Sequence, residues 1–354
     1  MNGDADGPFR GSGRRNGSRN SAPLLDVEDL RVTFEQPGIT IRAVRGISYQ
    51  IGRGEALGLV GESGAGKSVS ALALLGLLPR DAARVQAKSI RFDGKEIAAA
   101  REHELRKVRG IGISMIFQDP LSSLNPVLRI GKQITEQIRH HLDVDRAEAY
   151  DRAVGLLQMV GIPRPEQRIS SYPHEFSGGM RQRAMIAMAL SCGPALLIAD
   201  EPTTALDVTI QSQILDLIGN LRRELGMALL IITHDLGVIA NSTDRVAVMY
   251  AGHIVEQGPT RDVLADPIHP YTQGLLRSLP RLDNPKETEL TPISGDPPEL
   301  AGTITGCPFR PRCPRAMDRC RVENPSLALV SSNRVAACWA VEEISASAQR
   351  SGER

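Results

Sequence analysis

Aromatic residues and cysteine are scarce in this sequence, and neither sign of charge is in excess. Only 3% of the 354 residues are Phe, Trp or Tyr, which argues against a surface that stacks nucleic-acid bases. Lys and Arg number 42 against 41 Asp and Glu, so the net charge of +1 provides no dominant attraction to nucleic acid or anionic lipid. No apolar run is long enough to cross a bilayer, and no secretory leader is visible. The five cysteines disfavour a disulfide framework, and we expect a soluble cytosolic protein.

Shifts in composition divide the chain into segments. Residues 1–22 are rich in Gly, Ser, Asn and Arg and are predicted to be a disordered tail. Residues 23–257 alternate apolar strands with helices, which is typical of an α/β fold with a parallel sheet covered on both faces. Within them, residues 119–176 give only helical signals and predict an inserted α-helical subdomain. Residues 258–340 are rich in proline and predict a small Cys-containing C-terminal module, and 341–354 form a second tail.

Hydrophobic periodicity and turn residues predict the individual elements. The expected strands are Leu30–Phe34, Ala43–Ile51, Ala56–Val60, Leu196–Ala199, Leu229–Thr233 and Val246–Tyr250. The expected helices are Ser68–Leu78, which Pro79 would end, Met180–Leu190 and Ile210–Leu225. In the helical insert, Ile130, Ile134 and Ile138 recur every four residues and predict one apolar stripe. A capping box at Asp145 opens the next helix, whose inner side is predicted to hold Tyr150, Val154 and Leu157.

A glycine-rich loop lies between the strand at 56–60 and the first helix. Its residues read Gly-Glu-Ser-Gly-Ala-Gly-Lys-Ser and match the pattern G-x-x-x-x-G-K-[ST] without a gap. Glycines allow successive backbone N–H groups to point at an anion, and the N-terminus of the helix adds partial positive charge. We expect Lys67 to reach the β- and γ-phosphates of a nucleotide and the Ser68 hydroxyl to coordinate Mg²⁺. The nucleotide-binding residues of this loop are Gly61, Ser63, Gly64, Gly66, Lys67 and Ser68.

Polar residues that suit phosphate hydrolysis follow three other apolar strands. Asp200 and Glu201 end the run at 195–199, where open α/β sheets bind ligands. We expect Asp200 to hold Mg²⁺ and Glu201 to orient or deprotonate the attacking water. His234 follows the strand at 229–233 and is placed to contact the γ-phosphate. Gln118 precedes the helical insert, where a metal or water ligand would couple to a moving subdomain.

A second anion site is predicted ahead of the helix at 180–190. Ser177, Gly178 and Gly179 precede this helix, and the same amide and helix-dipole reasoning applies to them. One nucleotide does not need two phosphate cradles on separate subdomains. The arrangement makes sense if the second cradle closes on a nucleotide that is bound to a partner subunit.

At this point the sequence resembles the nucleotide-binding subunit of an ATP-binding cassette (ABC) transporter. The resemblance covers about residues 24–260. It consists of the Walker A loop (61–68), the Gln118 loop, the signature (176–180), Walker B (195–200) with Glu201, the D-loop (205–207) and the switch His234. It implies that Asp207 also contacts nucleotide and that Phe34 stacks on adenine. The signature departs from the common pattern at Phe176 and Met180, and the D-loop carries Thr204 where Ser is common.

The C-terminal segment at about 258–340 resembles that of oligopeptide and dipeptide importer ATPases, and nickel importers share it in part. The resemblance implies an ATPase that powers peptide import, with nickel or another small solute as the alternative cargo. It implies two ATPase subunits head to tail, two membrane permeases and an extracytoplasmic peptide-binding protein, with this chain on the cytoplasmic face of the inner membrane. A soluble clamp on nucleic acid shares the cassette, but the sequence has neither the long coiled coil nor the second cassette of such proteins.

Four of the five cysteines lie late in the chain, at Cys307, Cys313, Cys320 and Cys338. Four thiolates suit a [4Fe–4S] cluster or Zn²⁺, and the lack of C-x₂-C pairs favours the cluster over zinc, with no metal as the third alternative. Nearby cations would offset the negative charge of such a centre; these are Arg310, Arg312, Arg315 and Arg319. Cys192 is interpreted as a small buried apolar residue.

Overall fold

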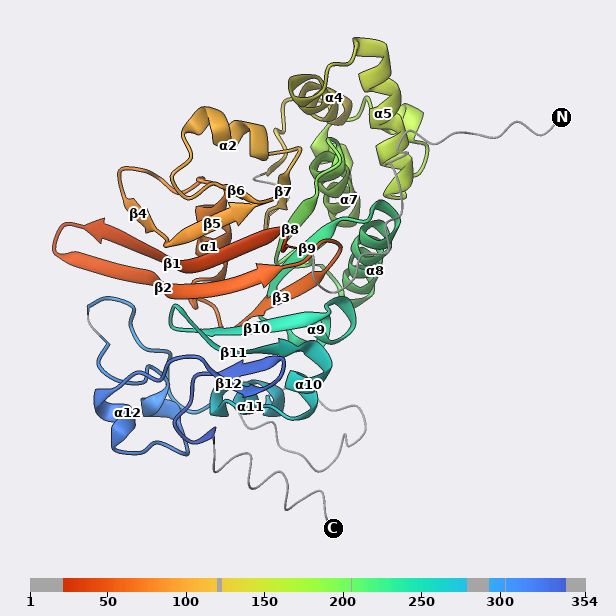
Figure 1. Ribbon diagram of the computed structural model, residues 1–354. Coiled ribbons are helices and arrows are strands. Elements are labelled where there is room, and N and C mark those ends of the chain that lie inside the picture. Colours follow the sequence, from red (N-terminus) through yellow and green to blue (C-terminus); the bar gives the residue numbers. More distant parts are fainter. Residues whose placement is uncertain (1–21, 120–122, 205, 279–292, 303, 342–354) are drawn as a thin grey trace. The chain divides into compact units, whose positions relative to one another are not determined.

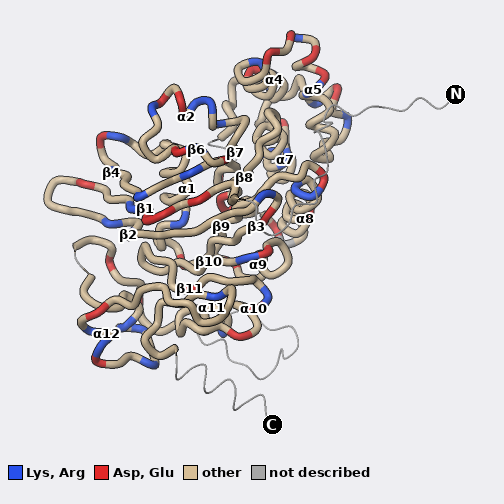
Figure 2. The backbone as a smooth tube through the Cα atoms, in the orientation of Figure 1, with Lys and Arg blue, Asp and Glu red and all other residues tan. Residues whose placement is uncertain are grey.

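The structure is a computed structural model that describes residues 22–119, 123–204, 206–278, 293–302 and 304–341 (Figure 1). The predicted tails at 1–22 and 341–354 lie almost entirely outside these ranges, as does Ala205. The described chain forms two units, and the division falls within strand β9 (Ala228–Thr233). Unit 1 consists mainly of residues 101–229, and unit 2 contains 25–51, 55–100 and the chain from 230 onward. Acidic and basic residues are interspersed along the described backbone of both units, in keeping with the balanced composition (Figure 2).

Unit 1 is mainly helical. Its elements are α2 (Glu102–Val108), β7 (Ile113–Ile116), α4 (Ile130–His141), α5 (Arg146–Met159), α6 (Pro165–Arg168), the 3₁₀ turn η1 (Pro173–Glu175), α7 (Gly178–Leu190), β8 (Leu196–Asp200) and α8 (Val208–Leu225). Helices α4, α5 and α7 pack against one another (Figure 1). The isoleucine stripe on α4 is buried, as predicted. Strands β7 and β8 are parallel, so their C-terminal ends lie at the same edge.

Helix α5 departs from its prediction at the start and on its inner side. Asp145 caps it by accepting a hydrogen bond from the Glu148 backbone N–H at 2.8 Å. The Glu148 carboxylate does not complete a capping box, because it pairs with Arg152 one turn on, at 2.6 Å. The buried positions are Ala149, Ala153, Leu156 and Leu157. Tyr150 is exposed, so its predicted place in the core is wrong: small alanines form the contact stripe.

Unit 2 contains two sheets. The first is antiparallel and comprises β1 (Leu25–Gln36), β2 (Ile39–Ile51), β4 (Ala83–Gln86), β5 (Ser89–Phe92) and β6 (Lys95–Glu96). Its strands run in the order β2-β1-β5-β6, and β4 also pairs with β1. In the second sheet β3 (Ala56–Val60) and β10 (Arg245–Tyr250) are parallel. Antiparallel strands extend that sheet beyond β10; these are β11 (His253–Pro259), β13 (Arg334–Ala336) and β12 (Ala328–Ser331). The expected parallel pairing is therefore found between β3 and β10, whereas β11, β13 and β12 pair antiparallel.

The helices of unit 2 are short. They are α1 (Lys67–Leu74), α9 (Leu236–Ser242), α10 (Thr260–Ala265), α11 (Pro270–Arg277), the 3₁₀ turn η2 (Arg310–Arg312) and α12 (Arg319–Val322). Helix α1 ends before the predicted Leu78. The residue that ends it is Gly76, whose φ of 60° continues the chain in the left-handed region, and not Pro79.

Candidate functional site

The phosphate loop connects β3 to α1 in unit 2. Gly64 and Gly66 have φ values of 78° and 100°, a region that residues with a Cβ atom rarely adopt. A Cβ on Gly66 would lie 2.3 Å from the Ala43 carbonyl oxygen, and a Cβ on Gly61 would lie 2.1 Å from that of Met249. Glycine is therefore required at both positions by the close approach of neighbouring backbone as well as by the turn. The loop has the conformation that an anion cradle needs.

Lys67 is folded back over this loop. Its side chain is buried, and Nζ donates hydrogen bonds to the carbonyl oxygens of Gly61 at 2.7 Å and Glu62 at 3.0 Å. A buried ammonium group needs such acceptors because water no longer solvates it. These carbonyls hold the Lys67 ammonium against the phosphate loop. Ser68 follows in the first turn of α1 and is half-buried. Phe34 lies on β1 in the same unit and is also half-buried, paired with Ile41 of β2.

The acidic pair at the end of β8 lies in unit 1. Asp200 is buried, and Glu201 has a φ of 44°, an uncommon value for a residue other than glycine. The Glu201 carboxylate oxygen Oε2 accepts hydrogen bonds from Gln118 Nε2 and from Thr204 Oγ1, each at 2.9 Å. Ile116 of β7 pairs with Ala199 of β8, which explains why Gln118 and Glu201 meet. The structure thus brings together two residues that the sequence singled out separately.

Thr204 is a member of this group that sequence reasoning missed as a site residue. Its backbone N–H donates to the Glu201 carbonyl oxygen at 3.2 Å, so residues 201–204 form a tight turn. The turn carries the Thr204 hydroxyl back to the Glu201 carboxylate. The signal in the sequence was a hydroxyl side chain three positions after the acid, a spacing that suits such a turn.

The predicted second anion cradle is the N-terminus of α7, also in unit 1. Ser177 caps this helix, and its Oγ accepts a hydrogen bond from the Met180 N–H at 3.3 Å. Ser177 and Gly178 are exposed, whereas Phe176 before them is buried and anchors the turn. A Cβ on Gly179 would lie 3.2 Å from Ile210 of α8. The start of α7 therefore lies against the start of α8.

Asp207, the implied D-loop contact, caps α8 by accepting a hydrogen bond from the Ile210 N–H at 3.0 Å. His234 is exposed and follows β9, in the part of the chain that belongs to unit 2. The predicted site residues consequently form two sets, one within each unit. Lys67, Ser68 and His234 belong to unit 2, while Gln118, Glu201 and the start of α7 belong to unit 1.

The late cysteines do not support the predicted metal centre. The Cys307 N–H donates to the Cys320 carbonyl oxygen at 2.9 Å. Burial raises the pKa of Cys307, Cys313 and Cys338, and the neighbouring thiols raise it further. Within the described ranges, no three His, Cys, Asp or Glu side chains are arranged to hold a metal ion. The described structure therefore does not support the predicted iron–sulfur cluster or zinc ion, and we derive no step through either.

Two of the arginines expected to offset a metal centre have other partners. Arg312 forms an ion pair with Glu62 of the phosphate loop at 2.7 Å. Arg319 pairs with Glu323 at 2.8 Å and lies 3.5 Å over the ring of Trp339. Cys192 is buried, as predicted for a small apolar residue, and burial raises its pKa.

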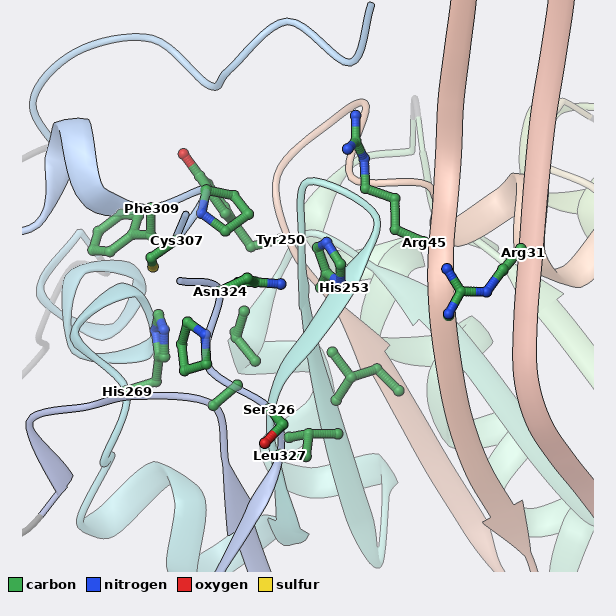
Figure 3. Close-up of a pocket in the computed structure, with 16 residues that line it drawn as sticks. Arg31, Arg45, Tyr250, His253, His269, Cys307, Phe309, Asn324, Ser326 and Leu327 are labelled. Atoms are coloured by element: carbon green, nitrogen blue, oxygen red, sulfur yellow. The ribbon is translucent and has the colours of Figure 1, made fainter. Parts of the chain in front are cut away.

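Unit 2 also contains a cavity of about 420 Å³, and none of the residues that line it is a predicted residue of the nucleotide site (Figure 3). Tyr250, Phe309 and Cys307 lie toward one end, and Arg45 and Arg31 lie toward the other (Figure 3). His253 also lines it; burial first, and then the charges of the two arginines, lower its pKa to about 4. Among the described helices, none is long and apolar enough to span a membrane.

A glycine-rich loop between a buried strand and a helix, with its lysine folded over the loop, defines a P-loop nucleotide-binding protein. Comparisons with known proteins narrow this class. The family model for the ABC transporter matches residues 44–204, and that for the oligopeptide/dipeptide transporter C-terminal region matches 255–320.

Relatives of known name share most of the chain's length. The oligopeptide transport ATP-binding protein OppD of Escherichia coli is 52% identical over 91% of this chain and 94% of its own. The dipeptide transport ATP-binding protein DppD of Bacillus subtilis is 47% identical over 93% and 98%, respectively. The solved structure of cbiO1 from Clostridium perfringens, part of the ABC transporter complex cbiONQ, matches with a TM-score of 0.58 and 29% identity over 70% of this chain and 92% of that one. This chain belongs to the ABC transporter ATP-binding proteins of the oligopeptide/dipeptide family. It is an ATPase of the ABC type, which confirms the family and fold class predicted from the motifs.

Proposed function

We propose that this chain is the ATP-hydrolysing subunit that powers import of dipeptides or oligopeptides across the cytoplasmic membrane. One observation carries the proposal: the ABC cassette and the oligopeptide/dipeptide C-terminal region occur in order in a single chain. The relatives that share both bear the names of oligopeptide and dipeptide transport proteins. The cassette indicates that ATP hydrolysis supplies the energy for transport, and the C-terminal region favours a peptide over nickel as the cargo.

ATP binding is assigned to the phosphate loop. The N–H groups of Gly61, Ser63, Gly64 and Gly66 and the Lys67 ammonium would hold the phosphates, because backbone donors in a glycine-rich loop and one buried cation match a polyanion. The Ser68 hydroxyl, Asp200 and Gln118 would hold Mg²⁺ through hard oxygen ligands, which this ion prefers. Phe34 would stack on the adenine.

Hydrolysis is assigned to Glu201 and His234. The Glu201 carboxylate is held in one orientation by two donors, Gln118 and Thr204, and in that orientation it would accept a proton from the attacking water molecule. His234 would contact the γ-phosphate and stabilise the charge that develops on it. Mg²⁺, when bound, neutralises charge on the β- and γ-phosphate oxygens.

A second ATPase subunit completes the proposed site. The cradle at Ser177, Gly178 and Gly179, of which the first two residues are exposed, lies at the N-terminal end of the α7 helix dipole and would bind the γ-phosphate of ATP on the partner. The Asp207 region would line the same interface. Closure around two nucleotides would move the predicted helical subdomain (119–176) and thereby two permease subunits, with a peptide-binding protein supplying cargo outside the cell. The chain would lie on the cytoplasmic face of the membrane as a peripheral subunit.

Uptake of a labelled tripeptide by cells that lack the chromosomal copy of this chain tests the proposal. The parent chain is expected to restore uptake, and Glu201→Gln is expected to abolish it while the assembled complex still binds ATP. Glu224→Gln, a matched change of an exposed acid on α8, is expected to behave like the parent. Restoration of ⁶³Ni²⁺ uptake without peptide uptake would reject peptides as the cargo. Hydrolysis by Glu201→Gln at the parental rate would reject its assigned role.

Metal analysis of the purified chain settles the cysteine question independently of transport. Iron or zinc at one equivalent or more per chain, lost in a Cys313→Ser variant, would contradict the structural finding.

A further inference from the structure

Glu62, the second residue of the phosphate loop, is held by a residue 250 positions further along the chain. Arg312 of η2 donates two parallel hydrogen bonds to its carboxylate, from Nη1 to Oε2 at 2.7 Å and from Nη2 to Oε1 at 2.9 Å. The side chain of Arg312 is 4% exposed and that of Glu62 is 26% exposed. This bidentate geometry is the strongest and most directional form of an arginine–carboxylate pair.

The backbone of Glu62 is held from the same region. Its N–H donates to the hydroxyl oxygen of Tyr271 at 2.8 Å, and Tyr271 lies on α11. An N–H that is engaged by Tyr271 does not turn into the cradle, so this contact sets where the phosphate loop begins to curl. The side chain and the backbone of one loop residue are therefore both attached to the C-terminal region.

The two anchors are rigidly supported. Tyr271, Tyr250 and Phe309 form a buried aromatic cluster with ring centroids 4.5 to 5.5 Å apart. Arg312 Nη2 also donates to the Ile293 carbonyl oxygen at 3.2 Å, and its Nε donates to that of Ser294 at 3.1 Å. The hydrogen bonds to Glu62 raise the pKa of Arg312, so the guanidinium remains charged at every physiological pH.

The loop end of this arrangement also contacts Lys67. The Glu62 carbonyl oxygen is one of the two acceptors of the Lys67 ammonium. Glu62, which Arg312 and Tyr271 hold in place, therefore also positions the phosphate-binding lysine. Tyr250 and Phe309 line the cavity of Figure 3, so the cluster borders open space on its other side. The described C-terminal residues Arg312 and Tyr271 thus restrain the loop at Glu62.

We propose that Glu62, Arg312 and Tyr271 form a clamp through which the C-terminal region sets the phosphate loop in its ATP-binding conformation. Arg312 and Tyr271 are positioning residues that act on ATP through Glu62. The inference rests on the proposed function only in taking ATP as the ligand. It gives the C-terminal region a role in the cassette's own nucleotide affinity.

Mg-ATP affinity and steady-state hydrolysis of the full chain, assembled with its permeases, test the clamp. In Arg312→Ala the dissociation constant and KM for ATP are expected to rise about tenfold, the range typical of coupling between two sites. The value of kcat is expected to change much less, because a misplaced loop weakens binding of substrate and transition state alike. Arg310→Ala removes an exposed arginine from the same 3₁₀ turn and is expected to leave both constants unchanged.

Three further variants separate positioning from general stability. Tyr271→Phe keeps the ring and removes only the acceptor, and a smaller rise in KM is expected from it. Glu62→Ala added to Arg312→Ala is expected to cause no additional loss, since both changes break one contact. Leu156→Ala creates a cavity in α5 of unit 1 and is expected to lower the melting temperature without raising KM.

Unchanged ATP affinity in both Arg312→Ala and Tyr271→Phe overturns the clamp. The clamp is also overturned if KM rises in every variant, Leu156→Ala included, in proportion to the decrease in melting temperature. If Arg312→Ala does not fold, Tyr271→Phe decides alone. Failure of the parent chain to bind ATP would instead reject the proposed function, so the two failures are distinguishable.

Discussion

Removal of the Thr204 hydroxyl is the sharpest test of how this site holds its water-activating acid. Glu201 has a left-handed backbone, and its Oε2 accepts one hydrogen bond from Gln118 and one from Thr204, both at 2.9 Å. Thr204→Val keeps the shape of the side chain and removes one of these two donors. A hydrogen bond to a charged group contributes about 1.5 to 3 kcal/mol. If that energy positions the carboxylate in the transition state, kcat should fall about 10- to 100-fold.

The assay is steady-state hydrolysis of ATP by the assembled complex, with kcat and KM determined separately. KM should remain close to the parental value, because Thr204 contacts Glu201, which is assigned to hydrolysis and not to binding of ATP. Thr204→Ser restores a hydroxyl at the same atom and should recover most of the rate. Equal kcat values for Thr204→Val and the parent, or equal losses for the Val and Ser variants, would refute the reasoning.

Two further predictions concern the phosphate loop and pH. Gly66→Ala places a Cβ 2.3 Å from the Ala43 carbonyl oxygen, at a φ of 100° that alanine rarely adopts. We therefore expect ATP affinity to fall at least a hundredfold, roughly 3 kcal/mol, in a titration with fluorescent nucleotide. Parental affinity would contradict the conclusion that the loop requires glycine at this position. Burial lowers the pKa of His269 to about 3, below the value near 6.5 of an unfolded chain, so its contribution to stability is complete above pH 6.5 and is lost as pH falls toward 3. In denaturant unfolding, the free energy of unfolding should decrease by roughly 2 to 3 kcal/mol between pH 7 and pH 4.5. His269→Asn retains an acceptor for the Tyr271 N–H and should make this decrease smaller. The same decrease in His269→Asn as in the parent would show that His269 is not its source.

Much of the candidate site could be predicted because its parts are contiguous in the chain. The phosphate loop, the acidic pair after β8 and the capping serine of α7 each depend on a strand, a turn and a helix that adjoin one another. Their chemistry follows from local backbone geometry, which glycine and capping residues specify directly. The strands and helices around them could be predicted for the same reason. The exception is the end of α1, because Gly76 ends the helix before the chain reaches Pro79.

The prediction of a metal centre at the late cysteines is not supported by the described structure, and it depended on residues far apart in the sequence. Spacing alone suggested a metal centre with arginines offsetting its charge. The structure instead places Arg312 on Glu62 and Arg319 over Trp339. A short polar segment without periodicity carries no sign of which distant residue it will meet.

By itself the sequence determined the ATPase class, the phosphate loop and the order of the catalytic segments, because these are encoded in runs of adjacent residues whose backbone preferences are local. Tertiary structure alone decided that Gln118 meets Glu201 across 83 positions and that Arg312 meets Glu62 across 250. Such pairs depend on the register of neighbouring strands and on the packing of a buried aromatic cluster. The strand register and the packing of the cluster are fixed only when the whole chain folds and its apolar faces are buried against one another.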